Sequence, residues 1–170
     1  MKSMKSMKSM KSMKKSGGFS VIETVIVVGF LVMFLLFIFS KTPVIKFMYD
    51  SFIFNNQHSE VVSSVERWKK GRSNFDGVTI QKVCQSGELS PSLCGSANDG
   101  KATNQFGGDW SVKVNAGSKG LFDVTATIPE DADRIPALAD TVAPSSRGRC
   151  TEATGCSTIT TTANSITTTH

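Results

Sequence analysis

FSVIETVIVVGFLVMFLLFIFS, from Phe19 to Ser40, is the stretch that decides how this chain of 170 residues folds. As a helix with a rise of about 1.5 Å per residue, it reaches about 30 Å, the thickness of the hydrocarbon core of a bilayer. Lysines precede the run and sequence of mixed charge follows it, which predicts a cytoplasmic N-terminus and a remainder outside the membrane. A secretory signal peptide is the competing interpretation, but its apolar part would be shorter and would end, rather than begin, beside small residues.

The basic character of the chain belongs to residues 1–18. The formal charge of +5 comes from 19 basic and 14 acidic residues, and six of the lysines stand before Gly18, so the remainder is close to neutral. The sequence therefore lacks the basic footprint of a nucleic-acid-binding protein. The repeat MKSMKSMKSMKSMKK offers several possible start sites, and repeat expansion explains it without a function.

Helical periodicity continues after the apolar run. Apolar residues recur at spacings of three and four and are interpreted as one apolar helix face: Val44, Phe47, Met48, Phe52, Val61, Val62, Val65 and Trp68. Pro43 should kink this helix, and Gly71 suits its C-terminal cap. We expect one long bent helix, apolar all round over 19–40 and amphipathic over 41–70.

Residues 71–170 are predicted to form a small globular domain. Trp110–Val114 and Phe122–Ile128 alternate apolar and polar residues, and the turn residues NAGSKG between them indicate a hairpin. RIPALADTV is expected to be a short helix, STITTTANSI favours a last strand, and the final SITTTH is expected to fray. A small antiparallel β-sheet packed on the amphipathic half of the long helix gives an α+β fold.

The cysteines favour an oxidising compartment. Their number is even, and all four lie after the membrane segment, at Cys84, Cys94, Cys150 and Cys156. Disulfides are favoured over a zinc site because no CxxC pair exists and the only histidines are His58 and His170. No metal and no cofactor are expected.

No catalytic constellation stands out in the sequence. GxSxG, HExxH and the phosphate-binding GxxxxGK[ST] are all missing. Asp131 and Asp133 are interpreted as solvated loop carboxylates, and the glycines of FGGDW as a tight turn before a strand. The chain is therefore not expected to be an enzyme.

Glu23 is the one charged residue inside the apolar run. A carboxylate in the hydrocarbon core costs on the order of 3 kcal/mol, so it needs a partner unless it is a chance polar residue near the interface. Cleavage between Gly18 and Phe19 would create an α-amino group at the start of the helix. That amine would be available to the Glu23 of its own chain or of a neighbour.

KKSGG followed by FSVIE resembles the cleavage and methylation signal of type IV prepilins. The resemblance implies that a membrane peptidase removes residues 1–18 after Gly18 and methylates the new amine of Phe19. It also implies that Glu23, the fifth mature residue, pairs with the N-terminus of a neighbouring subunit during filament assembly.

The rest of the chain is similar in order to type IVb pilins, above all those of conjugative thin pili and enteric adhesive pili. The segments that carry this similarity are NFDGVTIQKVCQSGELSPSLC, TNQFGGDWSVKV, FDVTATIPEDA and CSTIT. The chain departs from that pattern because no cysteine follows IPEDA. Three pairings remain open, and Cys84–Cys94 with Cys150–Cys156 is favoured because it closes two local loops.

These resemblances imply a structural subunit of a surface filament that serves adhesion, aggregation or conjugative mating contact. The implied partners are other copies, minor pilins, the prepilin peptidase and an inner-membrane assembly platform with a separate ATPase. The precursor would lie in the inner membrane, and the product would form an extracellular pilus on a Gram-negative cell. One alternative is a pseudopilin of a type II secretion system, although the acid-rich calcium loop common there is missing. Another is an uncleaved single-pass anchor, which leaves Glu23 unexplained.

Overall fold

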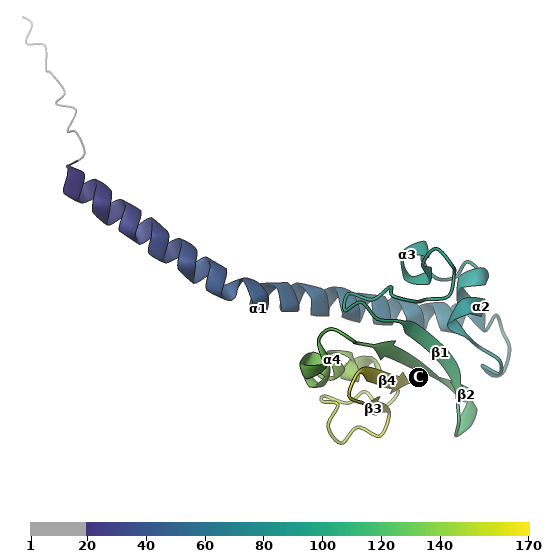
Figure 1. Ribbon diagram of the computed structural model, residues 1–170. Coiled ribbons are helices and arrows are strands. Elements are labelled where there is room, and N and C mark those ends of the chain that lie inside the picture. The colour runs from purple at the N-terminus through teal and green to yellow at the C-terminus, as the bar shows by residue number, and fades with distance from the viewer. Residues whose placement is uncertain (1–19) are drawn as a thin grey trace, which may run out of the picture. The chain divides into compact units, whose positions relative to one another are not determined.

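The computed structural model describes residues 20–170 (Figure 1). The chain divides into two units at Thr42, and each is described by itself. We call residues 21–42 the apolar segment and residues 43–170 the head. Helix α1, Val21–Trp68, is assigned without a break through both. Pro43 lies inside α1, at the first position of the head, and the expected kink there stays a prediction.

The head part of α1 packs one face into the core. Its buried residues follow each other at helical spacing: Ser51, Phe54, His58, Val61, Ser64, Val65 and Trp68. The prediction of a single apolar face is wrong, because Val44, Met48 and Phe52 are exposed. A helix turns by about 100° per residue. Positions 44, 48 and 52 therefore lie on one side of α1, and positions 54, 58, 61 and 65 lie on another side.

The end of α1 is capped by polar groups. The helix ends at Trp68, two residues before the predicted end, and Gly71 has a φ of +80°, a conformation that glycine adopts without a steric penalty. Arg72 donates from Nη2 to the carbonyl of Trp68 and from Nε to the carbonyl of Lys69. These bonds satisfy carbonyls that have no partner within the helix.

A four-stranded antiparallel sheet forms the second layer of the head. Its order is β1-β2-β4-β3, with β1 Trp110–Asn115, β2 Ser118–Thr127, β3 Ile159–Thr161 and β4 Ser165–Thr169. The predicted hairpin is confirmed as β1 and β2. Strand β2 starts earlier than predicted, because the Asn115 side chain accepts hydrogen bonds from the amides of Gly117 and Ser118 and closes a tight turn.

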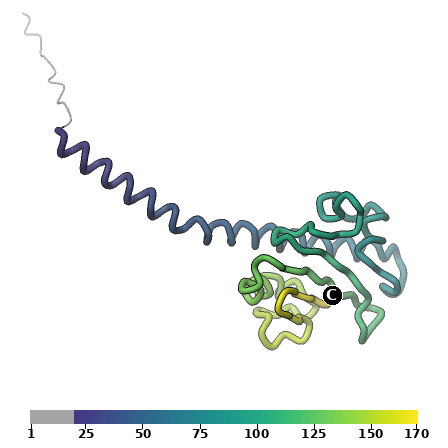
Figure 2. The backbone as a smooth tube through the Cα atoms, viewed as in Figure 1, coloured from purple at the N-terminus to yellow at the C-terminus, as the bar shows by residue number. Residues whose placement is uncertain are grey.

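The C-terminal stretch differs most from its prediction. The final residues do not fray: they form β4, which pairs with β2 on one side and β3 on the other. Figure 2 shows the chain returning to the sheet at its C-terminus. His170 and Phe122 exchange both backbone hydrogen bonds, so the pairing extends to the last residue.

Short helices and two disulfides complete the head. The helices are α2 Ile80–Gln85, α3 Pro91–Cys94, η1 Ala132–Arg134, α4 Ile135–Val142 and η2 Ala143–Ser145. Helix α4 is the predicted short helix, and it contacts β3 and β4. Cys84 pairs with Cys94, which joins α2 to α3, and Cys150 pairs with Cys156 in the loop before β3. These are the two local pairings favoured from the sequence.

Aromatic residues fill the space between α1 and the sheet. Phe54 of α1 stacks on Trp110 of β1 with ring centroids 5.2 Å apart, and Phe75 lies 4.6 Å from Phe122 of β2. Val124 and Ile166 point to the same core from β2 and β4. The long helix and the antiparallel sheet therefore form the predicted α+β fold.

Candidate assembly surface

The start of α1 is held by its own side chains. Ser20 Oγ accepts a hydrogen bond from the amide of Ile22 at 3.3 Å, and Glu23 Oε2 accepts one from the amide of Ser20 at 2.9 Å. Ser-x-x-Glu in this arrangement is a capping box, and an acid in the first turn also suits the helix dipole. Glu23 thus has a partner in its own chain. Ser20 and Glu23 have the three-residue spacing of a capping box, so this partner of Glu23 could be predicted from the sequence.

The predicted processing site lies outside the described residues. Gly18, Phe19 and the leader 1–18 belong to the part of the chain that the structure does not describe. Cleavage after Gly18, methylation of Phe19 and pairing of Glu23 with a neighbour remain predictions.

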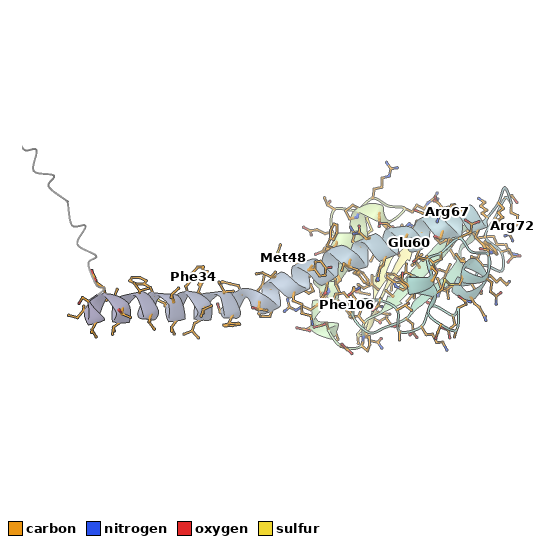
Figure 3. The ribbon with its side chains drawn as sticks, turned by 90° about the horizontal axis from the view of Figure 1, so that it is seen from above. Phe34, Met48, Glu60, Arg67, Arg72 and Phe106 are labelled. Atoms are coloured by element: carbon orange, nitrogen blue, oxygen red, sulfur yellow. A yellow bond between two sulfur atoms is a disulfide. The ribbon has the colours of Figure 1, made fainter. Side chains whose placement is uncertain are left out.

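The apolar segment exposes every large side chain it carries. The exposed fractions run from 42% for Ile38 to 79% for Val21, and the labelled Phe34 in Figure 3 projects freely. Within residues 20–170, α1 is the one helix long and apolar enough to cross a membrane. Its surface is the kind that a bilayer or another apolar helix covers.

A second exposed apolar surface lies on α1 within the head. We call Val44, Ile45, Met48, Tyr49 and Phe52 the apolar stripe; each is 52–67% exposed. Met48 is labelled in Figure 3. Beyond the stripe, the same outward side of α1 carries polar residues at helical spacing: Asn56, Ser59, Ser63 and Glu66. The outward face therefore changes from apolar to polar between Phe52 and Asn56.

A shallow groove of about 410 Å³ adjoins the stripe. It runs between α1 and α4 and is lined by Phe47, Met48, Ser51, Phe52, Asn55, Ala137 and Thr141. Ser51 Oγ is buried and has no hydrogen-bond partner. The groove is mostly apolar with one unsatisfied hydroxyl, so it suits an apolar segment better than water.

A buried polar cluster ties α1 to the C-terminal strand. His58 Nε2 lies 2.7 Å from Thr168 Oγ1, and the Ser145 hydroxyl lies 3.3 Å from His58 Nδ1. Burial lowers the pKa of His58 to about 3, with the nearby His170 as the second cause. Burial also lowers the pKa of His170 to about 4, although the carboxylate of Asp123 opposes this shift.

This cluster has a structural explanation. His58 is only 2% exposed, whereas Ser145 is an exposed residue whose hydroxyl donates to the carbonyl of Val142. Its bonds join three segments that are far apart in the sequence: α1, η2 and β4. Across residues 20–170, no group of three or more His, Cys, Asp or Glu side chains could hold a metal ion.

No family model, no curated protein and no solved structure matches this chain. The architecture itself is consistent with a pilin-like fold: a long N-terminal apolar helix whose second part packs on a four-stranded antiparallel sheet. The apolar helix indicates a membrane or secretory route, and the two disulfides indicate a domain outside the cytoplasm.

Proposed function

We propose that this chain is the structural subunit of a type IV pilus of the type IVb kind. The precursor is cleaved after Gly18, methylated on the amine of Phe19, and assembled through its apolar helix into a filament for adhesion, aggregation or mating contact. The observation that carries the proposal is an apolar surface that extends farther along α1 than a bilayer reaches.

The length of the exposed apolar surface separates a filament subunit from a simple anchor. A bilayer core is crossed by about 20 residues of helix, so a span that begins near Val21 ends near Ser40. The apolar stripe starts only at Val44, and the head leaves it uncovered up to Phe52. In a single-pass anchor the stripe would stay exposed, whereas a subunit that packs its helix among other copies would bury it.

Glu23 can serve both the helix start and the filament. One carboxylate oxygen, Oε2, accepts the Ser20 amide. An ionised carboxylate has about four acceptor sites, so the second oxygen remains free to accept from the Phe19 amine of a neighbour. The capping bond would hold the carboxylate in place and so favour one register between adjacent helices.

The remaining partners follow from the same proposal. The prepilin peptidase would process the precursor in the inner membrane, and an assembly platform with its own ATPase would extract it. Other copies and minor pilins would then cover the apolar segment and the stripe. The disulfide-bonded head would lie outside the cell, where an oxidising environment keeps both bridges intact.

The deciding experiment is the intact mass and N-terminal residue of the protein sheared from its native cells. We expect a chain that starts at N-methylated Phe19 and is recovered from the sheared fraction. Recovery of the same mature chain only from the periplasm would favour a pseudopilin. A chain that still carries Lys14 and Lys15 and stays in the membrane would overturn the proposal.

A further inference from the structure

A cavity of about 160 Å³ lies beside the first turns of α1 within the head. One wall is α1, with Pro43, Lys46, Phe47 and Asp50. The other wall is η1, with Asp131 just before it and Arg134 at its end, and Phe106 from the loop before β1 also lines the cavity. Each wall therefore presents one cation and one carboxylate.

The inner surface of this cavity is aromatic and fixed. Phe106, labelled in Figure 3, is only 2% exposed, and its ring centroid lies 6.5 Å from that of Phe47. The guanidinium carbon of Arg134 sits 4.5 Å from the Phe47 ring centroid. This cation–π contact places the guanidinium beside the cavity without using its N–H donors.

The four charges of the cavity have few partners in the described part of the chain. The side chains of Lys46, Asp50 and Asp131 make no ion pair and no hydrogen bond there. Arg134 is 3.8 Å from Asp133, at the outer limit of an ion pair. A simple anion would meet two carboxylates in this cavity, and a simple cation would meet two cations. A small molecule that carries both charges can satisfy both walls.

The position of the cavity along the chain indicates where such a molecule comes from. Pro43 follows Ser40, the end of the apolar run, by three residues. The headgroup layer extends about 5–8 Å beyond the hydrocarbon core, which corresponds to about three to five residues of helix. When residues 21–40 span the bilayer, Pro43 and Lys46 follow the span by three and six residues, about 4.5 Å and 9 Å of helix, which corresponds to the headgroup layer and its outer border.

We propose that this cavity binds a phosphoethanolamine group, the headgroup of phosphatidylethanolamine, while the precursor is in the membrane. Lys46 and Arg134 hold the phosphate, Asp50 and Asp131 accept hydrogen bonds from the primary ammonium, and the two methylenes lie against Phe47 and Phe106. The proposal rests on the membrane-spanning stage of the proposed function, but not on cleavage or filament assembly.

The test is lipid retention by the full-length precursor, purified in mild detergent and analysed by native mass spectrometry. The precursor is mixed with equal amounts of phosphatidylethanolamine, phosphatidylcholine and phosphatidylglycerol. We expect phosphatidylethanolamine to be retained about tenfold over the other two, because only it offers both a phosphate and ammonium N–H donors. Lys46→Gln should lower the retention of all three lipids, because each of them carries a phosphate, and Lys113→Gln, at an exposed lysine on β1, should change neither the retention nor the preference.

Any of the following three outcomes would contradict the proposal. Equal retention of phosphatidylethanolamine and phosphatidylcholine would mean that the ammonium donors are not recognised. Preference for phosphatidylglycerol would make the cavity an anion site. Binding of free phosphoethanolamine without lipid retention would assign the same chemistry to a soluble ligand. Asp131→Asn removes an acceptor for the ammonium and should remove the preference for phosphatidylethanolamine, and both disulfides must be intact in every sample. The experiment uses the uncleaved precursor, so the absence of lipid retention would not contradict the pilus proposal. Conversely, lipid retention by a chain that forms no filament would still support the lipid site.

Discussion

The apolar segment and the head part of α1 belong to one helix but differ in whether their side chains are exposed or buried. In the apolar segment, large side chains are exposed on all sides, and polar groups are confined to its ends. In the head, the same helix buries Ser51, His58 and Ser64 together with its apolar residues, and His58 and Ser64 find hydrogen-bond partners. The head therefore has its own core, whereas the apolar segment needs a bilayer or another apolar helix to cover it.

The largest effect is expected from emptying the core of the head. Trp110 is buried and stacks on Phe54, so Trp110→Ala should cost about 3–5 kcal/mol of unfolding free energy. Urea unfolding of the full chain in detergent measures this, with insertion of the apolar segment unaffected. Lys113→Ala, at an exposed position of the same strand, should change the free energy by less than about 0.5 kcal/mol. Equal losses for both variants would contradict the assignment of the core to this strand face.

The next effect concerns the apolar segment alone. Glu23→Gln keeps an acceptor for the Ser20 amide, as capping boxes accept glutamine, but removes the charge that a neighbouring amine requires. An amine without a carboxylate partner in the apolar core costs about 3 kcal/mol, so we expect the filament yield to fall about a hundredfold. Membrane insertion should be unchanged. Shearing and quantitative blotting give the yield.

Glu23→Ala, which removes both the cap and the charge, is the matched comparison. If Glu23→Gln assembles normally and only Glu23→Ala fails, helix capping is the role of Glu23, and pairing between subunits is not.

A smaller effect is expected where the two regions meet. Phe52→Glu places a charge on the apolar stripe, which the proposal buries against another copy, so filament yield should fall about tenfold. Asn56→Glu, one turn farther along the outward face, should leave the yield close to normal because solvent already faces that side. Normal filaments from Phe52→Glu would show that no other copy covers the stripe.

The smallest effect near neutral pH belongs to the head alone. His58 and His170 have pKa values lowered to about 3 and about 4, so the unfolded chain binds more protons than the folded chain below about pH 6.5. Stability is therefore full above about pH 6.5 and is lost as pH falls toward these values. Between pH 7 and pH 6 the loss is about 1 kcal/mol, rising toward about 1.4 kcal/mol per histidine for each further pH unit. Urea midpoints at pH 7, 6 and 5 measure it, and His58→Gln should reduce the dependence by about half, because His170 still contributes.

Local patterns in the sequence were enough for the elements whose partners are close in the chain. The periodicity over Val44–Trp68 and the alternation on both sides of the turn at Asn115 predicted the second part of α1 and the β1–β2 hairpin. Both Cys pairs close short loops, and the favoured pairing is the one that the structure has.

The parts that were missed depend on contacts far away in the sequence. TITTTANSITTTH has few apolar residues, and its strands are set by pairing with β2, where Thr168 meets Val124. Val44, Met48 and Phe52 of the apolar stripe share the spacing of the predicted apolar face, and spacing alone does not say which of two apolar faces meets the sheet. Glu23 caps the helix through a backbone amide, a partner that the search for a cation inside an apolar run does not consider.

The central place of β4 in the sheet has a consequence for the order in which the head folds. Strand β2 is synthesised about forty residues before β4, and β4 must insert between β2 and β3 before the sheet is complete. Because synthesis runs from the N-terminus to the C-terminus, the β1–β2 hairpin can form early, but one edge of β2 stays unpaired until residues 165–169 are available. An unpaired strand edge invites pairing with other chains. The last strand to be synthesised is therefore the one that covers the open edge of β2 and protects the folding head from pairing with another chain.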